Sequence, residues 1–337
     1  MRAYEVGNQK GLDSLRLATR PDPIPGPTQA IVKVGANALN HRDLMIMSAR
    51  YMGAKPETRI PVSDGAGEVI AVGTEVDNVV PGDRVVACHF AGWVNGPWDP
   101  AYFMPDLGNT ADGMLAEQVS IPAECLVKIP DSMSFQDACT LPVAGLTAWH
   151  AINELGQVKS GDTVLTLGTG GVSVFAVQLA SMAGARVAIT SSSDEKLEKM
   201  RALGADITAN YRTNPEWEKE IVEKTGGRGV DIVVETGGFG TLEKSLACAA
   251  PNARVGVIGG LAGPAEQLNL FALMIKNIVV KGITAGSRRM LEDLVRAAHA
   301  NGTKPVIDKV FSFDEAPAAY RYLEGASHIG KIVIDHS

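Results

Sequence analysis

Short apolar runs of alternating pattern, separated by clusters of glycine and proline, fill the first 130 residues of the chain. Runs of this kind predict β-strands, and the clusters between them predict turns. The predicted strands are Ala30–Val34, Gly67–Val72, Asp83–Cys88 and Glu117–Ile121. The pattern is typical of a small β-rich barrel or sandwich.

From Ser134 onward, apolar runs alternate with segments of helical period, which predicts a parallel sheet with crossover helices. The predicted strands are Thr163–Leu167, Arg186–Thr190, Asp231–Glu235, Arg254–Ile258 and Val279–Ile283. The predicted helices are Val172–Ala183, Glu195–Leu203 and Pro215–Lys224, the last with Asn214 as its N-cap. Beyond Gly286 we expect helices at Met290–Ala300 and Glu315–Leu323, a strand near Val310 and a final strand at Lys331–Ile334.

The chain has 337 residues, of which 45% are hydrophobic and 20% are charged, and its formal net charge is -7. This length exceeds what one hydrophobic core supports, so we expect about two domains. No block of like charge appears, and an acidic surface repels phosphate backbones, so we expect no nucleic-acid partner. The N-terminus lacks the pattern of a signal peptide, and no apolar run is long enough to span a membrane.

The four cysteines indicate which kinds of site the chain lacks. Cys88, Cys125, Cys139 and Cys248 form neither a CxxC pair nor a disulfide framework. Together with the absence of targeting signals, this predicts a reduced, cytoplasmic, globular protein.

A long irregular segment from Cys88 to Asp112 is rich in aromatic side chains and in glycine and proline. Loops of this length inside a compact domain tend to be lids or binding loops. A loop packed on its own aromatic rings is an equally good interpretation.

The sequence TVLTLGTGGVS at 163–173 places a buried strand, a glycine turn and the start of an apolar helix in order. In the dinucleotide fingerprint the first glycine makes the turn, the second admits the pyrophosphate, and the helix presents N–H groups to it. Gly168 and Gly170 fill these two places, and Gly171 and Val172 open the helix. Ser173 stands where a third glycine is usual, and its small side chain still permits close packing.

The residues after the second strand of this unit decide between the two nicotinamide cofactors. An NAD site places a carboxylate there for the ribose, whereas an NADP site places donors and a cation for the phosphate. Asp194 is the candidate NAD carboxylate, but Ser192 and Glu195 are expected to form a capping box around it. We therefore favour NADP(H), with Ser191, Ser192 and Lys196 around the phosphate; a solvated helix lysine is the alternative for Lys196.

Four further segments occur in order around the glycine turn: PVSDGAGEV at 61–69, PGDRV at 81–85, LPVAGLTA at 141–148 and HIGKIV at 328–333. With the glycine turn, they resemble the medium-chain dehydrogenase/reductase superfamily, within it the zinc-free quinone oxidoreductase-like branch. The resemblance implies an α/β chain with a GroES-like β-rich catalytic domain at 1–130 and a Rossmann doubly wound parallel sheet at 131–275. Residues 276–337 would complete the Rossmann domain and return to the catalytic domain. A homodimer joined through the edges of the Rossmann sheets is also implied.

The zinc-dependent members of this superfamily hold a catalytic metal, but the matching positions here are Asn40, Ser63 with Asp64, and Ala144. These side chains supply neither thiolate nor imidazole, so we expect no catalytic zinc. The loop that would hold a structural zinc has a single cysteine. His41, with Asp43 and Asp64 as oxygen ligands, is the alternative metal site; a satisfied polar histidine is the other interpretation.

Without a metal, hydride transfer needs an acceptor whose developing negative charge is delocalised or met by hydrogen-bond donors. Enones, enals and quinones meet that condition better than simple alcohols. The candidate donors are the amide of Asn40 and the phenol of Tyr51, and Asp43 between them is expected to orient Arg42 or a backbone turn. Similar reductases often carry a tyrosine where this chain has Met45.

The resemblance also implies three cofactor contacts: Thr147 near the nicotinamide, Tyr211 near the adenosine phosphate and Lys331 in the cofactor cleft. The expected activity is zinc-independent, NADPH-dependent reduction of an activated C=C bond or a quinone. An NAD(P)-dependent alcohol or carbonyl oxidoreductase is one alternative, because a fold does not fix its substrate. A non-catalytic NADPH-binding protein, like the crystallin-type members, is the other.

Overall fold

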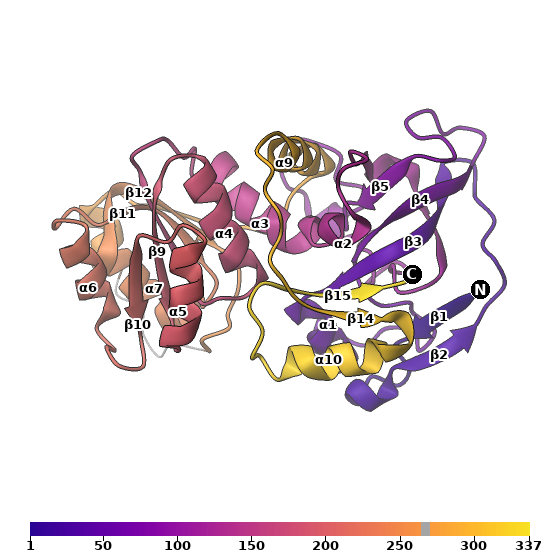
Figure 1. Cartoon of the computed structure of the whole chain (residues 1–337), viewed down its shortest axis with the longest axis horizontal. Coiled ribbons are helices and arrows are strands. Elements are labelled where there is room, and N and C mark those ends of the chain that lie inside the picture. The colour runs from indigo at the N-terminus through magenta and orange to yellow at the C-terminus, as the bar shows by residue number, and fades with distance from the viewer. Residues whose placement is uncertain (264–269) are drawn as a thin grey trace. The chain divides into compact units, whose positions relative to one another are not determined.

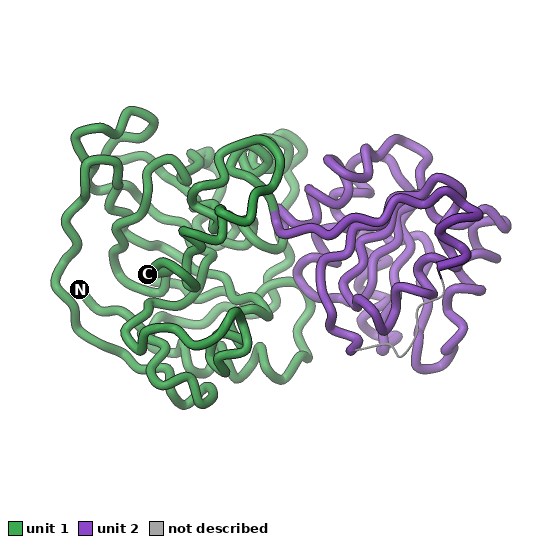
Figure 2. Tube along the Cα trace, turned by 180° about the vertical axis from the view of Figure 1, so that it is seen from behind, with its two compact units in different colours: residues 1–144, 286–337 green, residues 145–285 purple. Residues whose placement is uncertain are grey.

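The structure, a computed structural model, describes residues 1–263 and 270–337. The chain forms two compact units, unit 1 of Met1–Ala144 with Gly286–Ser337 and unit 2 of Gly145–Ala285 (Figure 2). The divisions come later in the chain than residues 130 and 275, where the sequence places them. Phe135 gives the reason for the first, because its ring lies against Gly35, where an added Cβ would come within 2.4 Å of it.

Unit 1 is built on a seven-stranded sheet in the order β14-β15-β3-β4-β5-β7, with β6 paired to β3 (Figure 1). The strands are β3 (Gln29–Leu39), β4 (Asp64–Val72), β5 (Arg84–Ala87), β6 (Gln118–Pro122), β7 (Leu126–Lys128), β14 (Ile307–Ser312) and β15 (Lys331–Asp335). A two-stranded ribbon adds β1 (Arg2–Glu5) and β2 (Arg16–Thr19). The helices of the unit are α1 (His41–Met47), α2 (Phe135–Ala138), α9 (Arg288–Ala300) and α10 (Ala316–Glu324).

The C-terminal strand sets the geometry of unit 1. β15 pairs antiparallel with β3, with Ile332 opposite Leu39, and β4 pairs with the other edge of β3, with Asp64 opposite Ala38. The end of β3 and the starts of β4 and β15 therefore lie side by side. Any residue placed just after β3 meets residues from both neighbouring strands.

Unit 2 is a six-stranded parallel sheet in the order β10-β9-β8-β11-β12-β13. Its strands are β8 (Thr163–Leu167), β9 (Arg186–Ser191), β10 (Ile207–Asn210), β11 (Val230–Glu235), β12 (Ala249–Val257) and β13 (Val279–Gly282). Its helices are α3 (Leu146–Trp149), α4 (Gly171–Met182), α5 (Asp194–Ala202), α6 (Trp217–Lys224), α7 (Phe239–Cys248) and α8 (Phe271–Ile275). The strand order reverses between β8 and β11, which makes the sheet doubly wound.

Helices lie on both faces of this sheet (Figure 1). α4 and α5 pack on β8, β9 and β10, while α7 packs on β11 and β12 and against α6. The core between the layers is apolar and includes Leu165, Val233, Leu246 and Val255. The predicted α/β class, with a β-rich part and a doubly wound parallel sheet, is confirmed.

The structure corrects some local predictions. α6 begins at Trp217 with Glu216 as N-cap, not at Pro215 with Asn214 as N-cap. Asn214 instead accepts the Glu216 N–H through Oδ1 at 3.1 Å and donates to Glu220 at 2.9 Å, so it satisfies the turn that precedes the helix. β10 and α7 have no counterpart among the sequence predictions.

Two further findings bear on the class of the protein. All four cysteines are buried free thiols. In the part of the chain that the structure describes, no helix has the length and apolarity needed to cross a bilayer.

Candidate functional site

The glycine turn of unit 2 lies at the carboxyl end of β8. Gly168 has φ +74, a conformation that favours glycine, and Gly170 is the N-cap of α4. Ser173 is 3% exposed and donates through Oγ to the carbonyl of Leu167 at 2.6 Å. A serine therefore replaces the third glycine because its hydroxyl ties the helix to the strand.

This turn fits a dinucleotide. An added Cβ at Gly168 or at Gly170 would meet no atom within 4 Å, so both backbones border open space. The N-terminus of the 12-residue helix α4, at Gly171 and Val172, adds N–H groups without helical partners and a positive dipole end. Open space beside such donors suits a pyrophosphate.

The tip of β9 shows which residues are available for the adenosine end of a cofactor. Ser191 is buried, Ser192 is half-buried, and Tyr211 is brought beside them because its N–H donates to the carbonyl of Ser191 at 3.1 Å. Lys196 is half-buried in the first turn of α5. These four residues, predicted separately from the sequence, gather around one strand end.

The predicted capping box at this place is wrong. The N-cap of α5 is Ser193, whose Oγ accepts the N–H of Lys196 at 3.3 Å, so Ser192 is not used as a cap. Asp194 accepts a hydrogen bond from Asn210 Nδ2 at 2.8 Å. Ser192 thus has no part in capping, and the carboxylate of Asp194 is held by a neighbouring strand.

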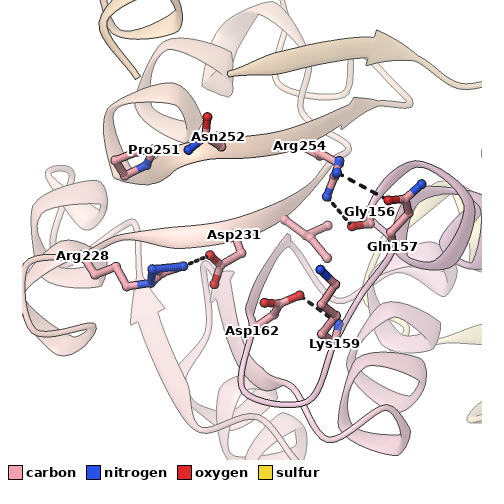
Figure 3. Close-up of a pocket in the computed structure, with 10 residues that line it drawn as sticks. Gly156, Gln157, Lys159, Asp162, Arg228, Asp231, Pro251, Asn252 and Arg254 are labelled. Carbon is pink, nitrogen blue, oxygen red and sulfur yellow. Dashed lines mark hydrogen bonds and ion pairs between the residues drawn. The ribbon is translucent and has the colours of Figure 1, made fainter. Parts of the chain in front are cut away.

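Figure 3 shows the residues that line a polar hollow of about 380 Å³. The hollow lies at the amino ends of β8 and β11, on the opposite edge of the sheet from the glycine turn. Its charged groups contact their neighbours: Arg228 pairs with Asp231, and Arg254 donates to the carbonyl of Gly156 at 3.1 Å. Asp162 accepts the N–H of Lys159 at 2.8 Å. Groups already satisfied in this way give no sign of a ligand.

The candidate donor Asn40 lies in unit 1, directly after β3. Its amide Nδ2 donates to Asp64 Oδ2 at 2.9 Å, and its Oδ1 accepts from Lys331 Nζ at 2.5 Å. Asp64 and Lys331 are buried, with Nζ of Lys331 at 3.8 Å from Asp64 Oδ2. The structure therefore joins two residues predicted for different roles, and adds Asp64 between them.

Asp43 has the positioning role that the sequence indicates. It is buried, and its Oδ2 accepts the backbone N–H of Asn40 at 2.7 Å in a capping box that starts α1. Its Oδ1 has no hydrogen-bond partner among the described residues. Burial raises the pKa of Asp43 to about 7, against the opposing effect of nearby Arg42.

Arg42 is oriented by Asp106 rather than by Asp43. Its guanidinium makes two parallel bonds of 3.0 Å to the buried carboxylate of Asp106. The same guanidinium lies 4.9 Å from the ring centre of Tyr51, the second candidate donor, whose pKa is raised by burial. The phenol of Tyr51 thus keeps its proton at neutral pH and is able to donate it in a hydrogen bond.

Asp106 comes from the long aromatic segment, whose rings pack on one another. Trp93 stacks on Tyr102 with ring centres 5.8 Å apart, and Trp98 meets Phe90 at 4.9 Å. The structure thus supports the packed-loop interpretation. The loop also contributes a buried carboxylate next to Tyr51, a role that no local sequence signal indicates.

One more buried carboxylate was not predicted from the sequence. Glu235, at the carboxyl end of β11, accepts the N–H groups of Gly237 at 2.8 Å and Gly238 at 3.0 Å, and it also bonds Thr241 and Ser245. It fixes the turn that follows β11 at the same sheet edge as the glycine turn. The available signal was the sequence of a glutamate, a threonine and two glycines at 235–238.

The remaining predicted residue, Thr147, is buried in α3 of unit 2. The candidate donors and Lys331 therefore belong to unit 1, and the other cofactor candidates belong to unit 2.

Comparison with known proteins shows which family the chain belongs to. Residues 26–131 match the alcohol dehydrogenase GroES-like domain, and residues 171–300 match the zinc-binding dehydrogenase model. A zinc-type alcohol dehydrogenase-like protein of Schizosaccharomyces pombe is 41% identical over 315 residues, covering 91% of each chain. The chain belongs to the medium-chain dehydrogenase/reductase superfamily.

Solved structures of the superfamily agree with the fold. A candidate alcohol dehydrogenase from Sinorhizobium meliloti has TM-score 0.92 and 40% identity, with 99% of both chains covered. A structure described as an NAD-dependent alcohol dehydrogenase has TM-score 0.90 and 33% identity over all of both chains. The quinone oxidoreductase of Pseudomonas syringae has TM-score 0.83 and 27% identity over 99% of both chains. Among relatives in sequence, the acryloyl-coenzyme A reductase of Metallosphaera sedula is 27% identical over 93% of this chain and 94% of its own.

One of the two matching family models is described as a zinc-binding dehydrogenase. The residues of this chain at the matching positions therefore have to be compared with the ligands that zinc prefers. Asn40, Ser63 and Ala144 offer an amide, a hydroxyl and a methyl group, and Ser63 donates to Asp64 Oδ1 at 3.0 Å. Asp64 already pairs with Lys331, and His41 is exposed while Asp43 is buried. No group of three or more His, Cys, Asp or Glu suited to a metal occurs among residues 1–263 and 270–337. This set does not fit zinc.

Proposed function

We propose that the protein is an NADPH-dependent, zinc-independent reductase of activated C=C bonds, with enones, enals or quinones as acceptors. The observation that carries the proposal is the cluster in which Asn40 and Asp64, both at positions that match the zinc site of other superfamily members, contact each other and Lys331. A neutral amide donor suits a delocalised oxyanion, whereas a simple alcohol or ketone needs a stronger electrophile. The acryloyl-coenzyme A reductase and quinone oxidoreductase relatives support this substrate class by their names.

In this proposal a bound nicotinamide would supply the hydride that adds to the β-carbon of the acceptor. The electron pair of the C=C bond moves toward the carbonyl oxygen, and a proton from solvent completes the α-carbon. Asn40 Nδ2 and the Tyr51 hydroxyl donate hydrogen bonds to the oxygen on which negative charge collects. Asp43 holds the backbone at Asn40, and Arg42 packs on the ring of Tyr51.

NADPH rather than NADH is proposed from the tip of β9. Ser191, Ser192, Lys196 and Tyr211 surround it, whereas Asp194 is engaged by Asn210. Hydrogen bonds to a charged group contribute about 1.5–3 kcal/mol each, so two of them give a preference of roughly a hundredfold or more. Lys196→Ala should weaken NADPH binding and leave NADH binding unchanged.

The proposal is tested by mixing the purified protein with NADPH and a panel of enones, enals and quinones, and following nicotinamide absorbance. Turnover is expected, it should survive treatment with a chelator, and Asn40→Ala and Tyr51→Phe should each lower it while NADPH binding is retained. Cofactor binding without any turnover would instead support a non-catalytic role.

A second function, NAD(P)-dependent alcohol or carbonyl oxidation and reduction, is favoured by the name of the NAD-dependent alcohol dehydrogenase structure. Oxidation of primary or secondary alcohols with NAD, but no enone reduction, would establish it. Equal affinity for NADH and NADPH would point the same way, because Asp194 would then serve the ribose.

We also propose a homodimer joined through unit 2. β13 is an edge strand of the sheet, and α8, which precedes it in the chain, exposes Phe271, Met274 and Ile275 at 61%, 65% and 65%. An edge strand together with exposed apolar side chains suits a second copy related by a twofold axis.

A further inference from the structure

Lys331 is a buried ammonium at the meeting point of three strands of unit 1. Its side chain is 3% exposed, and Nζ donates to the carbonyl of Leu39 at 2.7 Å and to Asn40 Oδ1 at 2.5 Å. Asp64, completely buried, lies 3.8 Å from Nζ. A buried charge needs partners of this kind, so the ammonium is fixed in place by the sheet.

The contacts determine which way the amide of Asn40 faces. An ammonium only donates, so the atom that meets Lys331 must be the amide oxygen, and an ionised carboxylate only accepts, so Asp64 must meet the nitrogen. The amide nitrogen carries two hydrogens, and the bond to Asp64 uses one of them. Asn40 is half-buried while its two partners are buried, so the second N–H belongs to the accessible member of the cluster.

We infer that Lys331 is a positioning residue for hydride transfer: it locks the Asn40 amide so that its second N–H faces the oxygen of the substrate. This inference rests on the proposed function and deepens it. The ammonium also draws electron density from the amide oxygen, which strengthens the N–H as a donor. The ammonium thus stabilises the developing oxyanion indirectly, by polarising the Asn40 amide. Zinc-dependent members of the superfamily use a metal at the matching place.

The inference differs from a role for Lys331 as a direct cofactor contact. A cofactor contact predicts that loss of the ammonium weakens NADPH binding. A positioning role predicts that NADPH binding is kept and that the rate falls, because the amide is then free to rotate and to present its oxygen to an oxyanion.

The test compares Lys331→Met with Lys33→Met, a matched control at an exposed lysine of β3. Lys331→Met should lower kcat on an accepted enone or quinone roughly 10²-fold, as loss of one preorganised donor does, with NADPH affinity within about twofold of the unmodified value. Asn40→Ala should give a similar loss, and the double variant should lose no more than either single one. Additive losses, or weakened NADPH binding with kcat unchanged, would overturn the inference.

A crystal structure of Lys331→Met provides a readout that needs no turnover. The Asn40 amide is expected to leave its present orientation, and an unchanged amide still donating to Asp64 would overturn the inference. If Lys331→Met does not fold because Asp64 is left unpaired, Lys331→Met/Asp64→Asn removes both charges and serves for the kinetic measurement, with Asp64→Asn as its reference. Failure of the unmodified protein to reduce any acceptor would reject the proposed function, and the crystal structure would still decide the orientation of Asn40.

Discussion

At the scale of single residues, the sequence proposed Asn40 as a donor to the substrate but did not indicate the side chains that hold it. Its partners Asp64 and Lys331 lie 24 and 291 positions away along the chain. They meet because β4 and β15 pair with opposite edges of β3, and that register is not encoded in any local pattern. The role of Asn40 stays a prediction from the sequence, whereas its contacts had to come from the structure of the sheet.

Asp43 carries a prediction about pH. Its pKa rises from 3.8 to about 7 in the folded protein because the carboxyl is buried. Between these values the folded chain keeps a proton that the unfolded chain has released, so this group makes stability fall as pH rises. Asp43→Asn cannot ionise, and its side chain retains an acceptor for the N–H of Asn40. The free energy of unfolding of this variant should therefore rise relative to that of the unmodified protein by roughly 2 kcal/mol between pH 5 and pH 8.

Chemical denaturation of both proteins at the two pH values measures this difference. Asp77→Asn, at an exposed position, is the control and should follow the unmodified protein at both. Parallel behaviour of Asp43→Asn and the unmodified protein would show that Asp43 is ionised in the fold throughout.

At the scale of elements, the strands could be predicted closely and the helix starts less well. β8 has the bounds that the sequence indicates, because five consecutive apolar or small residues are all buried in a central parallel strand. Helix starts depend on which of several adjacent polar side chains meets the free N–H groups. In the run Ser191, Ser192, Ser193, composition alone could not choose the cap.

This run gives a matched pair of variants. Ser193→Ala should destabilise the protein by about 1 kcal/mol because α5 loses its N-cap, with the effect seen in thermal or chemical denaturation. Ser192→Ala should leave stability unchanged and weaken NADPH binding without affecting NADH. If Ser192→Ala instead lowered stability and Ser193→Ala weakened NADPH binding, Ser192 would be the N-cap and Ser193 the cofactor contact.

The start of α4 allows a sharper test of the cofactor cradle. Gly170 has φ -76, which any residue adopts, and an added Cβ there meets no atom within 4 Å, so Gly170→Ala should fold normally. The same methyl group would occupy the space where a pyrophosphate approaches, and affinity for NADPH and NADH should fall together, as titration of nicotinamide fluorescence would show. Gly168→Ala is the contrast, because φ +74 strains an alanine and should lower stability as well. Unchanged affinity in Gly170→Ala would place the cofactor elsewhere.

At the scale of the whole molecule, the chain length predicted about two units, and the family resemblance implied the return of the C-terminal segment to the first. The exact divisions could not be predicted, because α2 and α9 are assigned to unit 1 by packing rather than by pattern. The exposed apolar side chains of α8 could not be predicted either, since an exposed apolar residue and a buried one look alike in sequence.

The apolar surface of α8 and the edge strand β13 lead to the last prediction. Met274 is 65% exposed on α8, and a charge there would have to be buried in any interface formed through this surface. Met274→Lys should therefore convert a dimer to a monomer in light scattering at micromolar concentration, while the fold of each chain is kept. Ile24→Lys places the same charge on an apolar residue of unit 1 that is 86% exposed, and it should remain dimeric. If the Met274→Lys protein stays dimeric, the two copies meet through another surface. If the unmodified protein is monomeric, the proposed homodimer is wrong.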